Sequence, residues 1–347
     1  MSMLKAIDFC CGAGGMTYGL RKAGINVLGG VDIDAECGAT YEKNNKGSRF
    51  LHADMNGLKN EDIESAFGVA ANDPNLIFVG CVPCQHWTLL HTSRKKSIAS
   101  KNLALTFARI VFEFNPGFVI LENVPGFLKR AGSPLKRVLA QMEKKGYSYA
   151  HDVLNTADYG VAQNRHRYLL IASRVHQPTL PKPTIKRPRT VSDAIRDFVP
   201  IAAGHRDESK LFHSSRALSE TNLARIRATP TNGGSRLAWK NDHALRVPAY
   251  ENTLRGEVFA DVYSRMYWER PAPTITTKFP SFSNGRFGHP EQNRAISIRE
   301  GAALQSFPNS YQFVSDHLGT AARMIGNAVP PLFAKAIGRA LIGQIRK

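Results

Sequence analysis

The stretch AIDFCCGAGG, residues 6–15, joins a short apolar run to a glycine-rich turn, and it decides the fold class. Gly12 and Gly14 carry no side chain, so the backbone of such a turn can approach a ligand closely. A segment of helical periodicity follows. A strand, a glycine turn and a helix in this order are typical of α/β proteins that bind a cofactor at the end of a strand.

The same theme repeats between residues 4 and 180. Short apolar runs that end in glycine or an acidic residue alternate with longer segments of helical period, which predicts a parallel sheet with crossover helices. The expected strands are residues 6–10, 27–32, 76–80, 118–122 and 168–172. All but the last end at a polar or glycine-rich turn, where open α/β sheets place their ligand sites.

The composition changes near Pro178, which predicts a domain boundary. Residues 177–189 hold four prolines among four Lys and Arg residues, a combination that resists regular structure. Apolar periodicity stays weak to about residue 265, and a helix with proline in its first turn is expected at residues 331–345. We therefore expect a larger α/β domain from residues 1–178 and 318–347, and a smaller, loop-rich domain from residues 179–317.

The charge of the chain favours a polyanionic partner. Lys and Arg total 46 against 28 Asp and Glu, a formal net charge of +18. The sequence has no apolar run of membrane-spanning length, so nucleic acid is preferred over a membrane. The N-terminus lacks a secretory signal, and an odd number of cysteines makes a poor disulfide framework. We expect a cytoplasmic, nucleoid-associated protein with reduced thiols.

The glycine turn and Asp32 form the first candidate site. Asp32 ends the second expected strand, where its carboxylate can accept hydrogen bonds from the hydroxyls of a ribose. On their own these residues leave three readings open: a nucleoside cofactor site, a nicotinamide site and a purely structural turn.

Cys84 is the candidate nucleophile. It lies near the start of a segment, residues 81–112, that contains no acidic residue but carries Arg94, Lys95 and Lys96. A positive field favours the thiolate, which is the nucleophilic form of cysteine. A buried structural cysteine and a zinc or redox pair with Cys81 are the alternatives. Zinc is disfavoured because no other Cys or His pair has ligand spacing.

Two further segments carry polar residues beside expected strands. Glu122 ends an apolar strand, where a half-buried carboxylate could hold or donate a proton near neutrality, although an N-cap or an ion pair is the structural alternative. Gln163, Arg165 and Arg167 alternate along the chain, so an extended backbone would place them on one face. Two guanidiniums on one face suit a phosphate or a base carbonyl, whereas a solvated charge run is the alternative.

Taken in chain order, these segments resemble the motif series of the cytosine-C5 DNA methyltransferase family, of the bacterial type found in restriction-modification systems or alone. The resemblance spans nearly the whole chain. It includes the turn at residues 8–15, PCQ at 83–85, ENV at 122–124, QNRHR at 163–167, Arg265 with PAPTI at 271–275, and GNAVPP at 326–331. Cys81, Val82, Trp87 and Thr88 depart from the residues usual in the family.

The resemblance implies a fold, a cofactor and a set of roles. The fold would be α/β, a Rossmann-like S-adenosylmethionine-dependent methyltransferase domain with a smaller, loop-rich target recognition domain at about residues 179–265. Cys84 would add to cytosine C6, Glu122 would act at N3 and Arg165 would contact O2, with Arg167 as the fourth catalytic residue. The cofactor residues would be Phe9, Cys10, Gly12, Gly14, Asp32, Asp54, Asn327 and Val329. The DNA-binding residues would be Arg94, Lys95, Lys96 and Gln163. No metal is implied.

The implied substrate is double-stranded DNA with its target base flipped out of the stack. A tRNA cytosine-C5 methyltransferase is the nearest alternative, and a catalytically silent DNA-binding protein is another. The basic module of roughly ninety residues argues against the first, and intact Cys84, Glu122 and Arg165 argue against the second. We expect a monomer, with any cognate restriction endonuclease acting separately.

Overall fold

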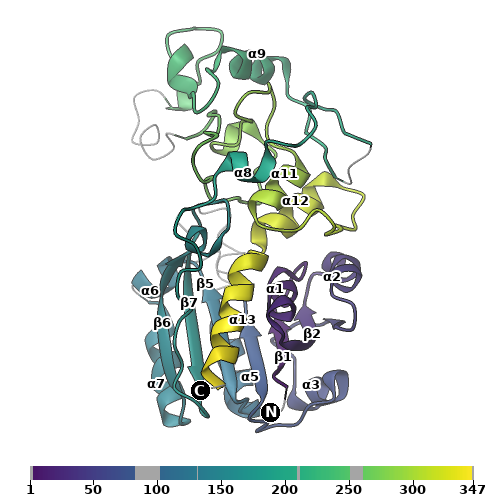
Figure 1. The fold of residues 1–347 in the computed structure, drawn as a ribbon, viewed down its shortest axis with the longest axis vertical. Helices are drawn as coiled ribbons and strands as arrows, with labels where there is room; N and C mark the ends of the chain where they lie inside the picture. The colour runs from purple at the N-terminus through teal and green to yellow at the C-terminus, as the bar shows by residue number, and fades with distance from the viewer. Residues whose placement is uncertain (1–2, 83–101, 131, 209–211, 251–260, 346–347) are drawn as a thin grey trace. The chain divides into compact units, whose positions relative to one another are not determined.

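The computed structural model describes residues 3–82, 102–130, 132–208, 212–250 and 261–345 (Figure 1). The chain divides into two compact units. The first comprises residues 1–159, 166–186 and 328–347, and the second comprises residues 160–165 and 187–327. The first unit contains a sheet flanked by helices. The second contains short helices joined by long loops.

The first unit is built on a seven-stranded sheet with the order β3-β2-β1-β4-β5-β7-β6. Neighbouring strands from β3 to β5 are parallel, whereas β7 is antiparallel to both β5 and β6. The strands are β1 Lys5–Phe9, β2 Asn26–Asp32, β3 Arg49–His52, β4 Leu76–Gly80, β5 Phe118–Asn123, β6 Ser148–Asn155 and β7 His166–Ser173. The α/β fold class is confirmed.

Two features of the sheet differ from the sequence prediction. The sheet is mixed rather than wholly parallel, because β7 runs against its neighbours. Strands β3 and β6 were also not expected. Both are edge strands without a single buried residue, so neither shows the continuous apolar run of a central strand such as β4.

The helices of the first unit pack on this sheet around an apolar core. Phe9, Phe78 and Phe107 meet edge to face, with ring centroids 5.0 and 5.6 Å from Phe9. The helices are α1 Gly15–Ala23, η1 Ala35–Cys37, α2 Gly38–Asn44, α3 Asn60–Phe67, α5 Leu103–Phe114, α6 Gly126–Lys129, α7 Leu135–Lys144, η3 Thr156–Tyr159 and α13 Pro331–Ile345. The helix expected at residues 331–345 is confirmed.

Helix α13 returns the C-terminal segment to the start of the chain by packing on α1 (Figure 1). Gly19 permits this contact, since a Cβ there would lie 2.4 Å from the Ala334 Cβ and from the Pro331 carbonyl oxygen. The N-terminal part of α13 therefore lies beside α1, the helix that leaves the glycine turn.

The second unit has few regular elements. They are α8 Val191–Ile195, α9 Glu220–Ala228, η4 Arg236–Trp239, η5 Pro248–Tyr250, η6 Phe282–Asn284, α11 Ile298–Leu304 and α12 Leu318–Asn327. A small apolar cluster contains Ile226, Trp239, Tyr263 and Phe282. Arg265 lies beside it with 1% exposure and donates five hydrogen bonds, to the carbonyl oxygens of Thr229, His289, Gln292 and Ile226 and to Asn293 Oδ1. Its guanidinium therefore joins the end of α9 to the loop at residues 289–293.

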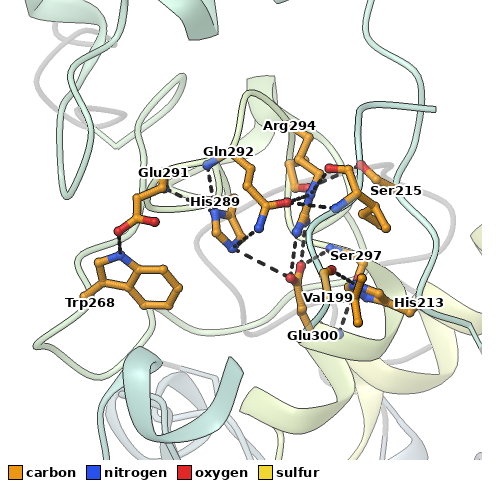
Figure 2. A network of polar contacts seen from close by, with 12 residues as sticks. Val199, His213, Ser215, Trp268, His289, Glu291, Gln292, Arg294, Ser297 and Glu300 are labelled. Carbon is orange, nitrogen blue, oxygen red and sulfur yellow. Dashed lines mark hydrogen bonds and ion pairs between the residues drawn. The ribbon is translucent and has the colours of Figure 1, made fainter. Parts of the chain in front are cut away.

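A buried polar network forms a second hub in this unit (Figure 2). Arg294 donates to both oxygens of Glu300, at 2.7 and 2.8 Å, and both side chains have no solvent exposure. Glu300 also accepts from the Ser297 N–H as part of the capping box that begins α11. The network therefore fixes the loop before α11 to that helix.

The boundary between the units differs from the expected one. The second unit begins at Arg187 rather than residue 179 and extends through Asn327 rather than residue 317. The extension follows from α12, because Gln305, just after α11, donates to the Ile325 carbonyl oxygen at 2.7 Å. In the described part of the chain, no helix is long and apolar enough to cross a membrane.

Candidate functional site

The carboxyl ends of the parallel strands gather the candidate residues of the first unit. In the register of the sheet, Phe9 is level with Val31 and Gly80, and Gly80 is level with Leu121. Residues that directly follow β1, β2, β4 and β5 therefore lie along one edge. In an open α/β sheet this edge is where ligands bind.

The glycine turn is fixed to Asp32. The Gly12 N–H donates to Asp32 Oδ2 at 2.7 Å, and the Asp34 N–H donates to Oδ1 at 2.9 Å. Gly12 has a φ of 51°, and a Cβ there would meet no atom of the described residues within 4 Å. The turn thus has the left-handed backbone that glycine supplies, and no described residue fills the space in front of it.

Asp8 lies beneath this turn and is completely buried. Its Oδ2 accepts a hydrogen bond from Thr17 Oγ1 at 2.8 Å, while its Oδ1 has no hydrogen-bond partner among the described residues. Burial raises the pKa of Asp8 to about 7, with a further contribution from the charge of Asp32. Asp8 is not among the candidate residues that the sequence indicated, although an acidic residue inside an apolar strand was a signal.

The two residues predicted to contact the cofactor beside the turn have different environments. Phe9 has no exposure, and its ring packs against Phe78 and Phe107 in the core, which leaves only its backbone for the predicted cofactor contact. Cys10 is partly exposed, with a φ of 57°. Ile33, which directly follows Asp32, is 66% exposed and was missed. An apolar residue just after a strand-ending acid was the available signal.

Asp54 follows β3, the strand that the sequence did not predict. The Ala53 N–H donates to the Asp32 carbonyl oxygen at 3.1 Å, so Asp54 lies at the same edge as Asp32. Asp54 Oδ1 accepts from the backbone N–H and from the side-chain amide of Asn56. Asp54 also lines a pocket of about 500 Å³ whose other walls come from β3, α3 and the loop between them.

Glu122 and Arg167 form an ion pair at the carboxyl end of β5. Glu122 Oε1 lies 3.0 Å from Arg167 Nε, and the two side chains are 9% and 13% exposed. Glu122 is level with Leu169 across the antiparallel ladder, so Arg167 comes from the start of β7 beside it. The pair places a carboxylate and a planar donor group next to each other.

Gln163 and Arg165 contact different partners from Arg167, and their predicted position on one face with Arg167 stays a prediction. They precede β7 and belong to the second unit, whereas Arg167 belongs to the first. Arg165 is 3% exposed and donates to the carbonyl oxygens of Ile275 and Gly326, at 3.0 and 3.1 Å. Gln163 has no exposure and bonds Gln305 and the Ile275 N–H, which contradicts its predicted contact with DNA.

Cys84 and the cations Arg94, Lys95 and Lys96 lie outside the described residues. The backbone that leads to Cys84 is described as far as Val82. The Cys81 N–H donates to the Phe9 carbonyl oxygen at 3.1 Å, and Asn123 Nδ2 donates to the Val82 carbonyl oxygen at 3.5 Å. Asn123 lies in the ENV motif at residues 122–124, but the sequence indicated no contact for its side chain. It links the end of β5 to the segment entering residue 83.

Burial raises the pKa of the Cys81 thiol well above its ordinary value, and the charges of Asp8 and Glu122 add to this effect. Cys81 therefore remains a protonated thiol near neutral pH. No group of three His, Cys, Asp or Glu side chains in the described ranges could hold a metal ion.

Asn327 and Val329 lie in the segment between α12 and α13. Asn327 ends α12 and is exposed, while Val329 is 4% exposed and precedes α13 by two residues. Because α13 packs on α1, Val329 belongs to the part of the first unit that adjoins the glycine turn.

Known proteins resemble this chain over nearly its whole length. Residues 4–343 match the family described as C-5 cytosine-specific DNA methylase. The chain is 35% identical over 341 residues to the Type II methylase M.HgiDII of Herpetosiphon aurantiacus, covering 96% of this chain and 94% of that protein. It is 30% identical over 347 residues to the Type II methyltransferase M1.HphI of Haemophilus parahaemolyticus, covering 98% and 87%.

Solved structures share the fold. A DNA modification methyltransferase encoded within an E. coli prophage superposes with a TM-score of 0.77 at 23% identity, covering 99% of this chain and 100% of that chain. A Spodoptera frugiperda DNMT2 mutant superposes with a TM-score of 0.64 at 16% identity, covering 99% and 100%. At these identities the likeness shows the fold alone.

Proposed function

The chain belongs to the C-5 cytosine-specific DNA methylase family and is a DNA cytosine-C5 methyltransferase, and we propose that it acts through Cys84, Glu122 and Arg167, with S-adenosylmethionine as the methyl donor. The observation that carries this assignment is the ion pair of Glu122 and Arg167 at the carboxyl edge of the sheet. There the segment leading to Cys84 is tied to β1 and to Asn123.

The residues at the glycine turn fit S-adenosylmethionine. No described residue fills the space in front of the Gly12 backbone, and no described residue hydrogen-bonds Asp8 Oδ1, a buried polar atom beneath the same turn. Asp32 would bind the ribose hydroxyls, and the exposed Ile33 side chain would give the adenine ring an apolar contact. Asp54, Cys10, Gly14, Asn327 and Val329 would complete the site. When bound, the sulfonium group supplies an electrophilic methyl.

Cys84 would begin the reaction on the base. Its thiolate adds to C6 of the cytosine, and the electron pair of the C5–C6 double bond shifts into the ring and makes C5 nucleophilic. The carboxyl group of Glu122 binds N3 and the 4-amino group, while the Arg167 guanidinium binds O2, so the developing charge is stabilised where it appears. The bound cofactor would supply the methyl group to C5 as its S–CH3 bond breaks, leaving S-adenosylhomocysteine. A base would then remove the C5 proton, and the C6–S bond would break to release Cys84 as a thiolate.

Arg165 would serve as a positioning residue. Its guanidinium bonds two backbone carbonyl oxygens within the second unit, so it supports the segments at Ile275 and Gly326. The role at O2 that the sequence suggested for Arg165 is better supported for Arg167, which contacts Glu122.

The substrate would be a duplex whose target cytosine is flipped out, because C6 is shielded inside the stack. Arg94, Lys95 and Lys96 would bind phosphates, and the second unit, with its basic stretch at residues 179–265, would read the sequence. We also propose monomeric action in the nucleoid. The Type II relatives suggest a cognate restriction endonuclease that acts separately.

Trapping on a fluorinated duplex tests this mechanism. With fluorine at C5 of the target cytosine, the final step has no proton to remove, so Cys84 should remain bonded to C6. Wild-type protein with S-adenosylmethionine should form a denaturant-resistant adduct, and Cys84→Ser should form none. Glu122→Gln and Arg167→Lys should trap slowly, because each keeps the nucleophile but weakens charge stabilisation.

Cys81→Gly provides the internal control, because Cys81 is a partly buried thiol with no role in this mechanism. It should trap at nearly the wild-type rate. A Cys81→Gly variant that formed no adduct would instead favour a site in which Cys81 and Cys84 act as a pair. Trapping on fluorinated tRNA alone would support the tRNA alternative, and trapping on neither substrate would support a silent DNA-binding protein.

A further inference from the structure

An exposed basic segment joins the two units at residues 181–189, and we call it the basic strap. Its sequence, PKPTIKRPR, contains four cations and no acidic residue. The side chains of Lys182, Lys186, Arg187 and Arg189 are all exposed. The catalytic mechanism uses none of them.

The first half of the basic strap is held against the first unit. Tyr159 Oη donates to the Pro181 carbonyl oxygen at 2.9 Å, and the Thr184 N–H donates to the Asp158 carbonyl oxygen at 2.9 Å. The Tyr159 ring in turn packs against Phe333 of α13, with ring centroids 5.0 Å apart. The strap therefore presents Lys182 and Lys186 from a fixed backbone rather than from a free linker.

This backbone lies at the catalytic edge of the sheet. Tyr159 and Asp158 belong to η3, which directly follows β6. Asn155, the last residue of β6, is level with His166, the first residue of β7. Tyr168, also in β7, is level with Asn123 at the end of β5. Strand β6 is two strands away from β5, a distance of about 10 Å. The strap thus lies beside the edge that carries Glu122.

The two lysines are suited to phosphate contact. Among the described residues neither Lys182 nor Lys186 forms an ion pair, whereas Arg187 and Arg189 lie near Asp193 and lower its pKa, after the larger effect of the Thr190 backbone hydrogen bond. Duplex DNA carries one charge per about 1.7 Å of helix axis, so 10 Å of duplex presents about six charges. Lysine binds such charges without reading sequence.

We propose that the basic strap is a second DNA-contact surface, in which Lys182 and Lys186 bind backbone phosphates of the duplex beside the target base. This inference rests on the proposed function, since it takes the edge at Glu122 as the place where the flipped cytosine enters. Within the stretch at residues 179–265, it assigns the strap to affinity and leaves the reading of sequence to the residues that follow the strap.

A matched pair of double variants tests the proposal. Lys182→Gln with Lys186→Gln removes two charges from the strap. Lys144→Gln with Lys145→Gln removes two exposed lysines at the end of α7, which leads into the opposite end of β6. The eight residues of β6 separate the two places by about 25 Å. Both variants have the same net charge, so only position differs.

The readout is the affinity for a non-specific duplex as a function of salt. Each lost phosphate contact should lower the slope of log K against log salt by about 0.9 and weaken binding about eightfold at 0.1 M salt. The strap variant should lose up to about two contacts, and the control variant should lose none. Single-turnover methyl transfer at saturating DNA and the methylated sequence, read by bisulfite sequencing, should match wild type for both.

Three results would overturn the proposal: an unchanged slope in the strap variant, equal slope changes in both variants, or a changed recognition sequence. Failure of the proposed function would look different, because wild-type protein itself would then not form the fluorocytosine adduct.

Discussion

The two units bury different kinds of side chain, and the difference follows from how each satisfies its backbone. In the first unit the peptide groups of the central strands pair with one another, so strands such as β4 and β5 can fill the core with apolar residues. In the second unit the elements are short, and charged side chains are buried instead: Arg265, Arg294, Arg299 and Glu300. Loop carbonyl groups that lack a ladder still need donors when buried.

Arginine suits this task because its planar guanidinium carries five N–H donors and stays charged. Arg265 donates to four backbone carbonyl oxygens, two at the end of α9 and two in the loop at residues 289–292, and Arg299 donates to the Tyr311 carbonyl oxygen. A loop-rich module can thereby hold a defined shape with a small apolar core. The cost is sensitivity to the loss of one buried charge.

The largest effect is expected at Glu300 in the second unit. Glu300→Gln leaves Arg294 buried without its counter-charge, which should destabilise the unit by about 3–5 kcal/mol. Denaturant unfolding with hydrogen exchange would measure it. Glu208→Gln is the control, because Glu208 pairs with Arg206 on the surface of the same unit. The stability of this control variant should stay close to that of wild type. Equal effects would show that the buried pair is not a structural hub.

A smaller loss is expected for Arg265→Lys. The charge is kept, but an ammonium group has three donors and no fork, so at least two of the five hydrogen bonds are lost. We expect the free energy of unfolding of the second unit to fall by about 2–3 kcal/mol, at roughly 1–1.5 kcal/mol for each lost bond. A calorimetric scan of the variant checks this. Wild-type stability would mean that the loops hold without Arg265.

As pH falls from 7 to 5, the folding stability of the two units should change in opposite directions. In the second unit, burial lowers the pKa of His289 to about 3, so stability is present above the unfolded pKa of 6.5 and is lost as pH falls toward 3. In the first unit, burial raises the pKa of Asp8 to about 7, so its contribution favours folding at low pH and is lost as pH rises from 3.8 through 7. Hydrogen exchange at pH 7 and pH 5 would resolve the two units.

His289→Gln should reduce the difference in stability of the second unit between pH 7 and pH 5. Asp8→Asn should reduce the same difference in the first unit. Parallel responses of both units in wild-type protein would refute the assignment of these two groups.

The smallest loss is expected for a conservative change in the sheet. Ile120→Val removes one methylene from a completely buried position on β5, which should cost about 1 kcal/mol. Fluorescence-monitored urea unfolding would show a small shift in midpoint with an unchanged slope. A loss as large as that of Arg265→Lys would mean that the apolar unit is no more tolerant of conservative changes than the polar one.

The sequence predicted the buried centre of the sheet better than its edges. The strands at residues 76–80 and 118–122 were predicted because a central strand is a continuous apolar run, and β4 is the observed Leu76–Gly80. The exposed edge strands β3 and β6 lack that run. The antiparallel direction of β7 was also missed, because direction depends on the path of the chain and not on the residues within the strand.

The sequence by itself determined the fold class, the glycine turn with Asp32 and the family of the enzyme, because local spacing and chain order record these features. Only the tertiary structure decided that Arg167 pairs with Glu122, that Arg165 and Gln163 brace the second unit, and that Phe9 packs in the core. Residues 163–167 pass from one unit to the other, so their alternation along the chain could not predict what each side chain contacts.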